Sequence, residues 1–95
     1  MFAVAFDFDI SELKTYYGDP YNNAYLEIRN IMKKYGFRWI QGSTYITDNE
    51  DMANLAFLMS EFSEIEWFAR SVKDIRAFEI KNWSNYTDFV KRKFV

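Results

Sequence analysis

Asp7 is the residue of this sequence whose surroundings point most directly to chemistry. It lies near the end of an apolar run, and a carboxylate in such a place is costly unless it is paired, bound to a metal ion or left at an open edge. We therefore expect Asp7 to be a catalytic carboxylate, and we keep it as a candidate ligand for Mg²⁺ or Mn²⁺. A helix cap or a hydrogen bond to a nearby turn is the structural alternative.

The residue inventory restricts the chemistry that can assist this carboxylate. The chain has no cysteine and no histidine, which excludes disulfides, thiolate chemistry, imidazole metal sites and histidine-based proton transfer. Proton transfer therefore falls to Asp, Glu, Lys, Tyr or water. Asp9 follows Asp7 on the same side of an extended chain and is a second candidate oxygen ligand, although an exposed loop acid is the simpler interpretation.

Arg76 and Ser43 are the side chains most suited to contact a phosphate group. The planar guanidinium of Arg76 could neutralise phosphate charge or hold Asp7 or Asp74 in place. A structural salt bridge with Asp74 or Glu79 is the alternative for Arg76. Ser43 could donate a hydrogen bond to a phosphate oxygen, but it could equally be only a turn residue.

Further basic and aromatic residues could guide a nucleic-acid strand. The basic residues are Arg70, Lys73, Lys81, Lys91, Arg92 and Lys93, and the rings available for base stacking are Trp39, Tyr45 and Trp83. A phosphate backbone could follow such a path. The alternative is that the basic residues near the C-terminus complement a helix C-terminus and keep the protein soluble.

Length and charge limit the architecture to one small domain without a strong overall field. Residues 1–95 suffice for a single core, and 49% of them are hydrophobic, too many for a disordered segment. Twelve basic and fourteen acidic residues give a net charge of −2, so any nucleic-acid site must be local. No run is long and apolar enough to span a membrane and no basic segment precedes the first apolar residues, so we expect a cytoplasmic protein.

The elements that must position these residues alternate between strand and helix. The apolar patterns predict a strand over residues 1–8, followed by a helix from Asp19-Pro20 to Tyr35 that Gly36 closes. Two strands over 37–41 and 44–47, joined by Gly42-Ser43, come next, and then a helix that is capped by Thr47 and Glu50 and runs to Phe62. The rest of the chain is predicted to form a helical turn over 63–69, a strand over 75–80 and a short helix from Ser84 to Lys91.

This order predicts the α+β, ferredoxin-like βαββαβ sandwich, in which two helices cover one face of an antiparallel sheet. The other face would stay wet, although the first strand is apolar on both sides. A homodimer packed sheet to sheet resolves that conflict. A monomer whose C-terminal helix folds across the open face is the alternative.

Three segments together resemble the VapD family of bacterial ribonuclease-like toxins. They are MFAVAFDFD at the start, GFRWIQGSTYIT in the middle and IEWFARSVKDIRAFEI near the end. Their order and separation match the family as well, so the likeness covers essentially the whole chain. Two positions depart from the usual pattern, because Phe2 stands where Tyr is usual and Lys73 where Arg is usual.

The resemblance implies a Cas2-like fold, a homodimer, cleavage of single-stranded RNA and pairing with an antitoxin protein. By position it assigns the catalytic carboxylate to Asp7 and places Ser43, Asp74 and Arg76 in the family's motifs. Together with the residue types, this makes Asp7, Ser43 and Arg76 the candidate catalytic residues and Asp74, Tyr45 and Lys73 the candidate supporting or RNA-binding residues. It leaves the metal dependence open. Two other functions remain: a dimeric Cas2-like scaffold that binds nucleic acid or a partner protein without cleaving RNA, and a ferredoxin-like sensor of small molecules.

Overall fold

A four-stranded antiparallel sheet forms the centre of the protein. The computed structural model describes residues 1–94. The strands are β1 (Phe2–Phe8), β2 (Arg38–Gln41), β3 (Thr44–Thr47) and β4 (Val72–Glu79), arranged in the order β2-β3-β1-β4. This is the strand order of the ferredoxin-like sandwich that the sequence predicts, and it makes β1 a central strand with β4 along one edge.

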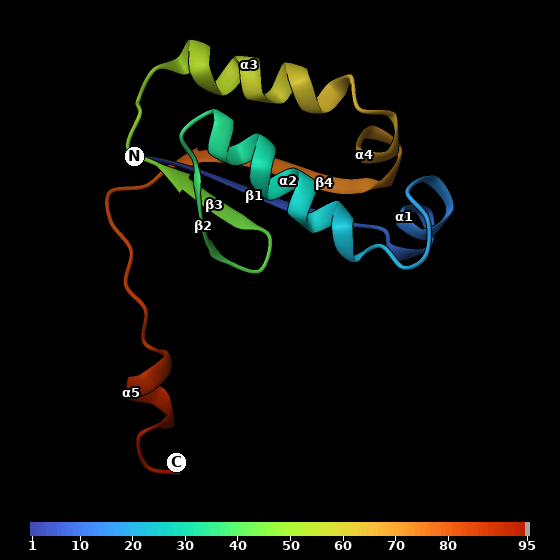
Figure 1. The fold of residues 1–95 in the computed structure, drawn as a ribbon. Coiled ribbons are helices and arrows are strands. Elements are labelled where there is room, and N and C mark those ends of the chain that lie inside the picture. Colours follow the sequence, from blue (N-terminus) through green and yellow to red (C-terminus); the bar gives the residue numbers. More distant parts are fainter. Residues whose placement is uncertain (95) are drawn as a thin grey trace.

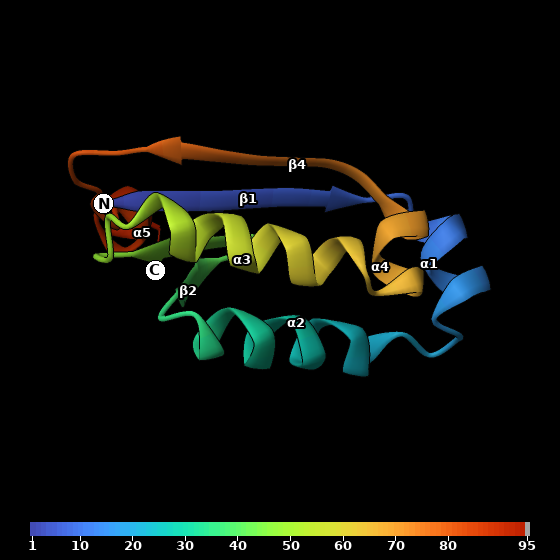
Figure 2. The same ribbon diagram turned by 90° about the horizontal axis from the view of Figure 1, so that it is seen from above.

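The two long helices pack on one face of this sheet (Figures 1 and 2). The helices are α1 (Ile10–Tyr16), α2 (Asn22–Lys34), α3 (Met52–Ser63), α4 (Glu66–Ser71) and α5 (Thr87–Lys91). Between α2 and α3 on one side and the sheet on the other lies a core that includes Val4, Phe6, Phe8, Ile28, Met32, Tyr45, Leu58 and Phe62. Because the even-numbered residues of β1 enter this core, the odd-numbered residues face the opposite, open side.

The hairpin between β2 and β3 and the end of α2 form as the turn residues predict. Gly42 has a φ of +46° and Gly36 a φ of +81°, the left-handed region that glycine enters without a steric penalty. At the end of α2 the amide of Phe37 donates to the carbonyl of Met32 at 2.9 Å, so the last turn is closed by backbone groups.

Several predicted helix starts are wrong. α1 was expected to be loop, but Asp9 caps it by accepting from the amide of Glu12, and α2 begins after Asp19-Pro20, with Tyr21 at its N-cap. Asp51 caps α3 by accepting from the amide of Ala53. The expected capping residues are engaged elsewhere: Thr47 ends β3 and accepts from the amide of Asn49, Glu50 pairs with the N-terminal ammonium, and Ser84 lies before the α5 cap, Tyr86.

The open face of the sheet is not covered by the C-terminal helix. α5 lies on the side of the sheet away from α2 and α3 (Figure 1), and none of its residues is buried. The radius of gyration is 14.9 Å, whereas a compact chain of this length should give about 12 Å, because the segment after β4 extends from the body. In the described part of the chain, no helix has the length and apolar character needed to cross a membrane.

Candidate active site

Asp7 and Asp74 face each other across neighbouring strands at one end of the sheet. Asp7 ends the regular part of β1 and is paired in register with Asp74 of β4, immediately before the register shifts. Both residues are exposed, and by the alternation of β1 they lie on the face away from the helices. Asp7 has no side-chain hydrogen-bond partner among residues 1–94, so its carboxylate is free to contact a ligand.

Arg76 lies two residues after Asp74 on the same strand and is held by it. The Nε atom of Arg76 donates to both carboxylate oxygens of Asp74, at 3.0 and 3.3 Å. The side chain of Arg76 is 76% exposed, and its two terminal nitrogens have no hydrogen bond within the described residues. Asp74 therefore orients the guanidinium and leaves its outer edge free for an anion.

Ser43 comes to the same end of the sheet from the other side of β1. Its carbonyl oxygen accepts a hydrogen bond from the amide of Phe6 at 3.1 Å, which places the hairpin turn next to the residue that precedes Asp7. Residues from β1, β4 and the β2–β3 turn thus converge, although the chain separates them widely. The arrangement offers a free carboxylate, an oriented guanidinium and a nearby hydroxyl-bearing turn.

Two of the predicted site residues, Tyr45 and Lys73, do not join the cluster of Asp7, Asp74, Arg76 and Ser43. Tyr45 is only 3% exposed, and its ring stacks on Phe6 at a centroid distance of 6.3 Å within the core. We therefore do not retain Tyr45 among the residues that contact RNA bases. Lys73 is exposed at the start of β4, beside Asp74. Asp9 serves as the cap of α1, which is a structural role.

Tyr25 of α2 packs against the core, as its helical spacing indicates. Burial raises the pKa of the Tyr25 phenol, and the negative potentials of Tyr21 and Asp7 raise it further. Its ring packs edge-on against Phe8, at 5.9 Å between centroids. Helical spacing correctly indicates a side chain at the core, but only the fold shows that this phenol lies within electrostatic reach of Asp7.

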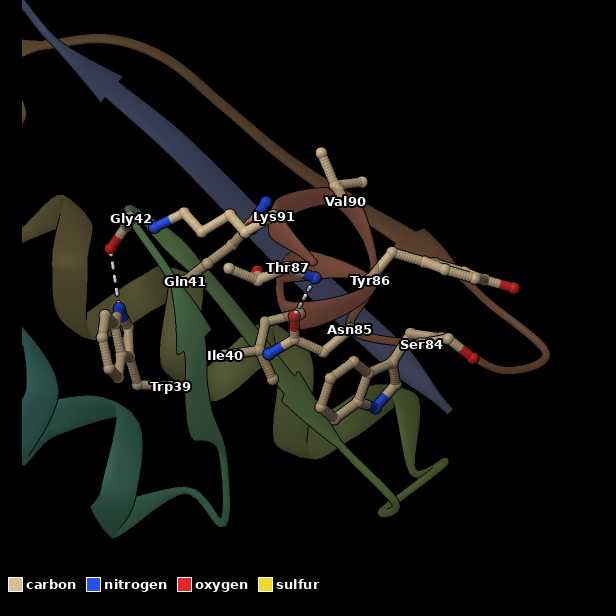
Figure 3. A pocket seen from close by; sticks show the side chains of 11 residues that line it. Trp39, Ile40, Gln41, Gly42, Ser84, Asn85, Tyr86, Thr87, Val90 and Lys91 are labelled. Carbon is tan, nitrogen blue, oxygen red and sulfur yellow. Dashed lines mark hydrogen bonds between the residues drawn. The ribbon is translucent and has the colours of Figure 1, made fainter. Parts of the chain in front are cut away.

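A pocket of about 830 Å³ lies beside the hairpin, between β2 and the segment that follows β4 (Figure 3). It is lined by Trp39, Gly42, Trp83 and Lys91, among others. Two of the rings and one of the basic residues that the sequence singled out are therefore brought together. Gln41, the last residue of β2, and Asn85 also line the pocket. They were not foreseen there, because a single polar residue carries no periodic signal.

The carboxylates suit a divalent cation in type but not in number. Asp7 and Asp74 supply the hard oxygen ligands that Mg²⁺ and Mn²⁺ prefer. Among the described residues, however, no group of three or more acidic side chains is placed to hold a metal ion. A cation at this site would take the rest of its ligands from water and phosphate, as Mg²⁺ commonly does.

Comparisons with known proteins agree with this architecture. The model of the family described as "CRISPR associated protein Cas2" matches residues 1–87. The chain is 57% identical to a protein named Endoribonuclease VapD 1 from Riemerella anatipestifer over 84 residues, which cover 88% of this chain and 94% of the relative. It is 50% identical to Endoribonuclease VapD of Dichelobacter nodosus, across 96% of this chain and 98% of the relative. This chain therefore belongs to the VapD family and carries a Cas2-family domain.

Proposed function

We propose that this protein is an endoribonuclease that cleaves single-stranded RNA, with Asp7 as its catalytic carboxylate. The observation that carries the proposal is the exposed, unpaired Asp7 beside an oriented Arg76 at the end of a buried strand. The names of the relatives support the same reaction class. Asp7 is also accessible to solvent, as a group that must reach a phosphodiester has to be.

In one form of this reaction the ribose 2′-hydroxyl is the nucleophile. Asp7 accepts the proton of the 2′-hydroxyl, the 2′-oxygen bonds to phosphorus, and the bond from phosphorus to the 5′-oxygen breaks. Arg76 neutralises the charge that develops on the phosphoryl oxygens, and Ser43 lies near the leaving 5′-oxygen, which takes a proton from solvent. Bound at Asp7 and Asp74, Mg²⁺ or Mn²⁺ would supply an activated water as the alternative nucleophile.

The products of cleavage distinguish the two nucleophiles. Attack by the 2′-oxygen gives a 2′,3′-cyclic phosphate, whereas attack by water leaves a 3′-hydroxyl on one fragment. The test compares cleavage of a single-stranded RNA by wild type and by Asp7→Asn, with and without a chelator, and identifies the new ends. Full activity of Asp7→Asn would reject Asp7 as the catalytic group. Loss of wild-type activity in the chelator would favour the metal-assisted form.

A homodimer is the assembly that the open face supports best. Ala3 pairs in register with both Ile46 and Phe78, so these three residues share the face away from α2 and α3. Ala3 and Ile46 are buried within the chain, and Phe78 is 45% exposed. Apolar side chains on an exposed sheet face are commonly covered by a partner. Light scattering should give the mass of a dimer for wild type and of a monomer for Phe78→Asp. A monomeric wild type would reject this assembly.

Pairing with an antitoxin is part of the same proposal and rests on the family resemblance. Induced expression of wild type should arrest growth of a bacterial host, and expression of Asp7→Asn should not. Co-expression of a small protein encoded next to this gene should restore growth and co-purify with the toxin. Growth that is unaffected by an RNA-cleaving wild type would separate the nuclease from a role as a toxin.

A non-enzymatic scaffold is the second candidate, because the same open face could bind a protein or a nucleic acid without cleavage. RNA binding by wild type that persists in Asp7→Asn, with no cleavage by either form, would favour the scaffold. A sensor of small molecules would instead be indifferent to RNA.

A further inference from the structure

The pocket between β2 and the segment after β4 is separate from the paired carboxylates and is not used in the proposed reaction. Strand residues from Trp39 to Gly42 line one side, and residues from Trp83 to Lys91 line the other (Figure 3). Its volume of about 830 Å³ is within the range of pockets that bind small molecules or single groups of a larger ligand.

Exposed aromatic rings line the side of this pocket that follows β4. Trp83 is 44% exposed and Tyr86 65% exposed. Trp39 pairs in register with Tyr45, whose ring lies in the core, and the guanidinium of Arg29 on α2 lies 4.6 Å from its ring centroid, so the Trp39 ring lies on the helix side of β2. An exposed indole such as that of Trp83 is a suitable surface for stacking by a nucleobase, since every base has a π-face.

The polar groups of the pocket suit a nucleotide better than an apolar partner. Gln41 presents an amide that can donate to and accept from a base edge, and the amide nitrogen of Asn85 can donate to one, while its carbonyl oxygen accepts from the amide of Thr87 at 2.9 Å. Lys91 carries the single charged side chain among the described lining residues, and none of them is acidic. In a chain with more acidic than basic residues, this local absence of carboxylates favours an anionic ligand.

The pocket also adjoins the proposed cleavage site. Gly42 lines the pocket, and the next residue, Ser43, accepts a hydrogen bond from the amide of Phe6, which precedes Asp7. A strand of RNA positioned at Asp7 and Arg76 therefore needs only to pass the hairpin turn to reach the pocket.

We infer that the pocket binds a nucleobase of single-stranded RNA next to the nucleotide whose bond is cleaved. This inference rests on the proposed function. The pocket thus extends the site beyond the scissile phosphate and makes cleavage depend on the length of the substrate. Trp83 provides a stacking ring and Lys91 contacts the phosphate that links the bound base to the cleaved nucleotide.

Two measurements test the inference. The first compares cleavage of a dinucleotide with cleavage of a longer single strand of the same sequence. Trp83→Ala should reduce the preference for the longer strand about 10-fold, the order expected for one lost base-stacking contact. Lys91→Gln, as a separate variant, should also reduce this preference, and more strongly in low salt than in high salt. Phe57→Ala and Lys14→Gln are the controls, because Phe57 on α3 is 64% exposed and Lys14 is exposed on α1, both outside the pocket lining.

The second measurement is independent of cleavage. A 2′-O-methyl RNA, which has no free 2′-hydroxyl, should quench tryptophan fluorescence of wild type, and Trp83→Ala should lose most of that quenching.

If wild type cleaves RNA but Trp83→Ala alters neither the preference for the longer strand nor the quenching, the inference is overturned while the proposed function stands. If no RNA is cleaved but quenching persists, the proposed function fails and binding at the pocket stands. A change from dimer to monomer in Trp83→Ala, with RNA binding intact, would assign the pocket to a second copy and overturn the inference.

Discussion

Asp7 and Asp74 occupy opposite positions on neighbouring antiparallel strands, yet only Asp74 has a cationic partner. Arg76 binds both oxygens of Asp74 and leaves Asp7 without a counter-charge in the described chain. Like charges directly opposite each other weaken a sheet. The two residues therefore differ in their contacts: Asp74 orients the guanidinium, and Asp7 remains an unpaired carboxylate beside it in the described chain.

Replacing Asp7 should separate stability from activity. Asp7→Asn removes the like-charge contact with Asp74, so we expect the free energy of unfolding to rise by roughly 0.2–1 kcal/mol, the range of cross-strand pairs. RNA cleavage should fall at least about 100-fold, as expected for loss of a general base. Urea denaturation and single-turnover cleavage measure the two effects.

Asp9→Asn is the matched control for this loss of charge. Asn caps a helix about as well as Asp, so the cap of α1 should persist and cleavage should stay near the wild-type rate. An Asp7→Asn protein that is less stable than wild type would contradict the electrostatic interpretation of the pair. Equal losses of activity in both variants would show that net charge, and not the position of Asp7, determines the rate.

Arg76→Lys should reduce the rate of the chemical step more than it reduces RNA binding. Lysine keeps the charge, but it has neither the Nε contact with Asp74 nor the planar fork. We expect kcat to fall roughly 100-fold, the scale of one lost donor to a transition-state oxyanion, with a small change in KM. The control is Arg38→Lys, since Arg38 pairs with Asp48 at 3.1 Å on the far strand. A loss confined to KM would make Arg76 a binding residue only.

The pattern of apolar residues was enough to predict the sheet but not the first helix. β1, the hairpin and α2 show alternation, turn residues or helical spacing, and they lie close to where the sequence places them. α1 buries only Leu13, so it has no apolar stripe to reveal it. The start of β4 was missed for a similar reason, because Lys73 and Asp74 are exposed and do not resemble a buried strand.

The candidate site could be predicted only in part. The sequence identified Asp7 and Arg76 from their types and places on strands. The pairing of Asp7 with Asp74 required the register between strands that are far apart in the chain, which no local pattern determines. The same limit explains Tyr45: its register opposite Val4 directs the ring into the core, whereas the hairpin sequence alone leaves either face open to it.

The stability of the protein should depend on pH through Glu61, which joins α2 to α3. Glu61 accepts hydrogen bonds from the ammonium of Lys34 and, at 2.7 Å, from the hydroxyl of Tyr35. The bond from Lys34, followed by that from Tyr35, lowers the pKa of Glu61. Its contribution to stability is therefore complete above the unfolded value of about 4.3 and is lost as pH falls through the lower folded value.

At high pH the sign is reversed. The hydrogen bond to Glu61 raises the pKa of Lys34 and of Tyr35, so their contributions are present below about pH 10 and are lost as pH rises through the folded values. Urea denaturation of wild type and Glu61→Gln should differ most between about pH 5 and 10. Glu64→Gln, an exposed change just beyond the same helix, should show no such window. A difference that is constant with pH would contradict this assignment.

Two adjacent residues of α3 should differ sharply in their effect on stability. Leu58 is fully buried between α3 and the sheet, whereas Phe57 is 64% exposed on the same helix. Leu58→Ala should lower the free energy of unfolding by about 2–5 kcal/mol, because it leaves a cavity in a packed core. Phe57→Ala should change it by less than about 0.5 kcal/mol, as for most surface substitutions. Denaturation of both variants by urea measures the contrast. A loss at Phe57 comparable to that at Leu58 would show that the outer face of α3 is buried in solution, and so would locate a protein contact on the side of the molecule opposite the open sheet.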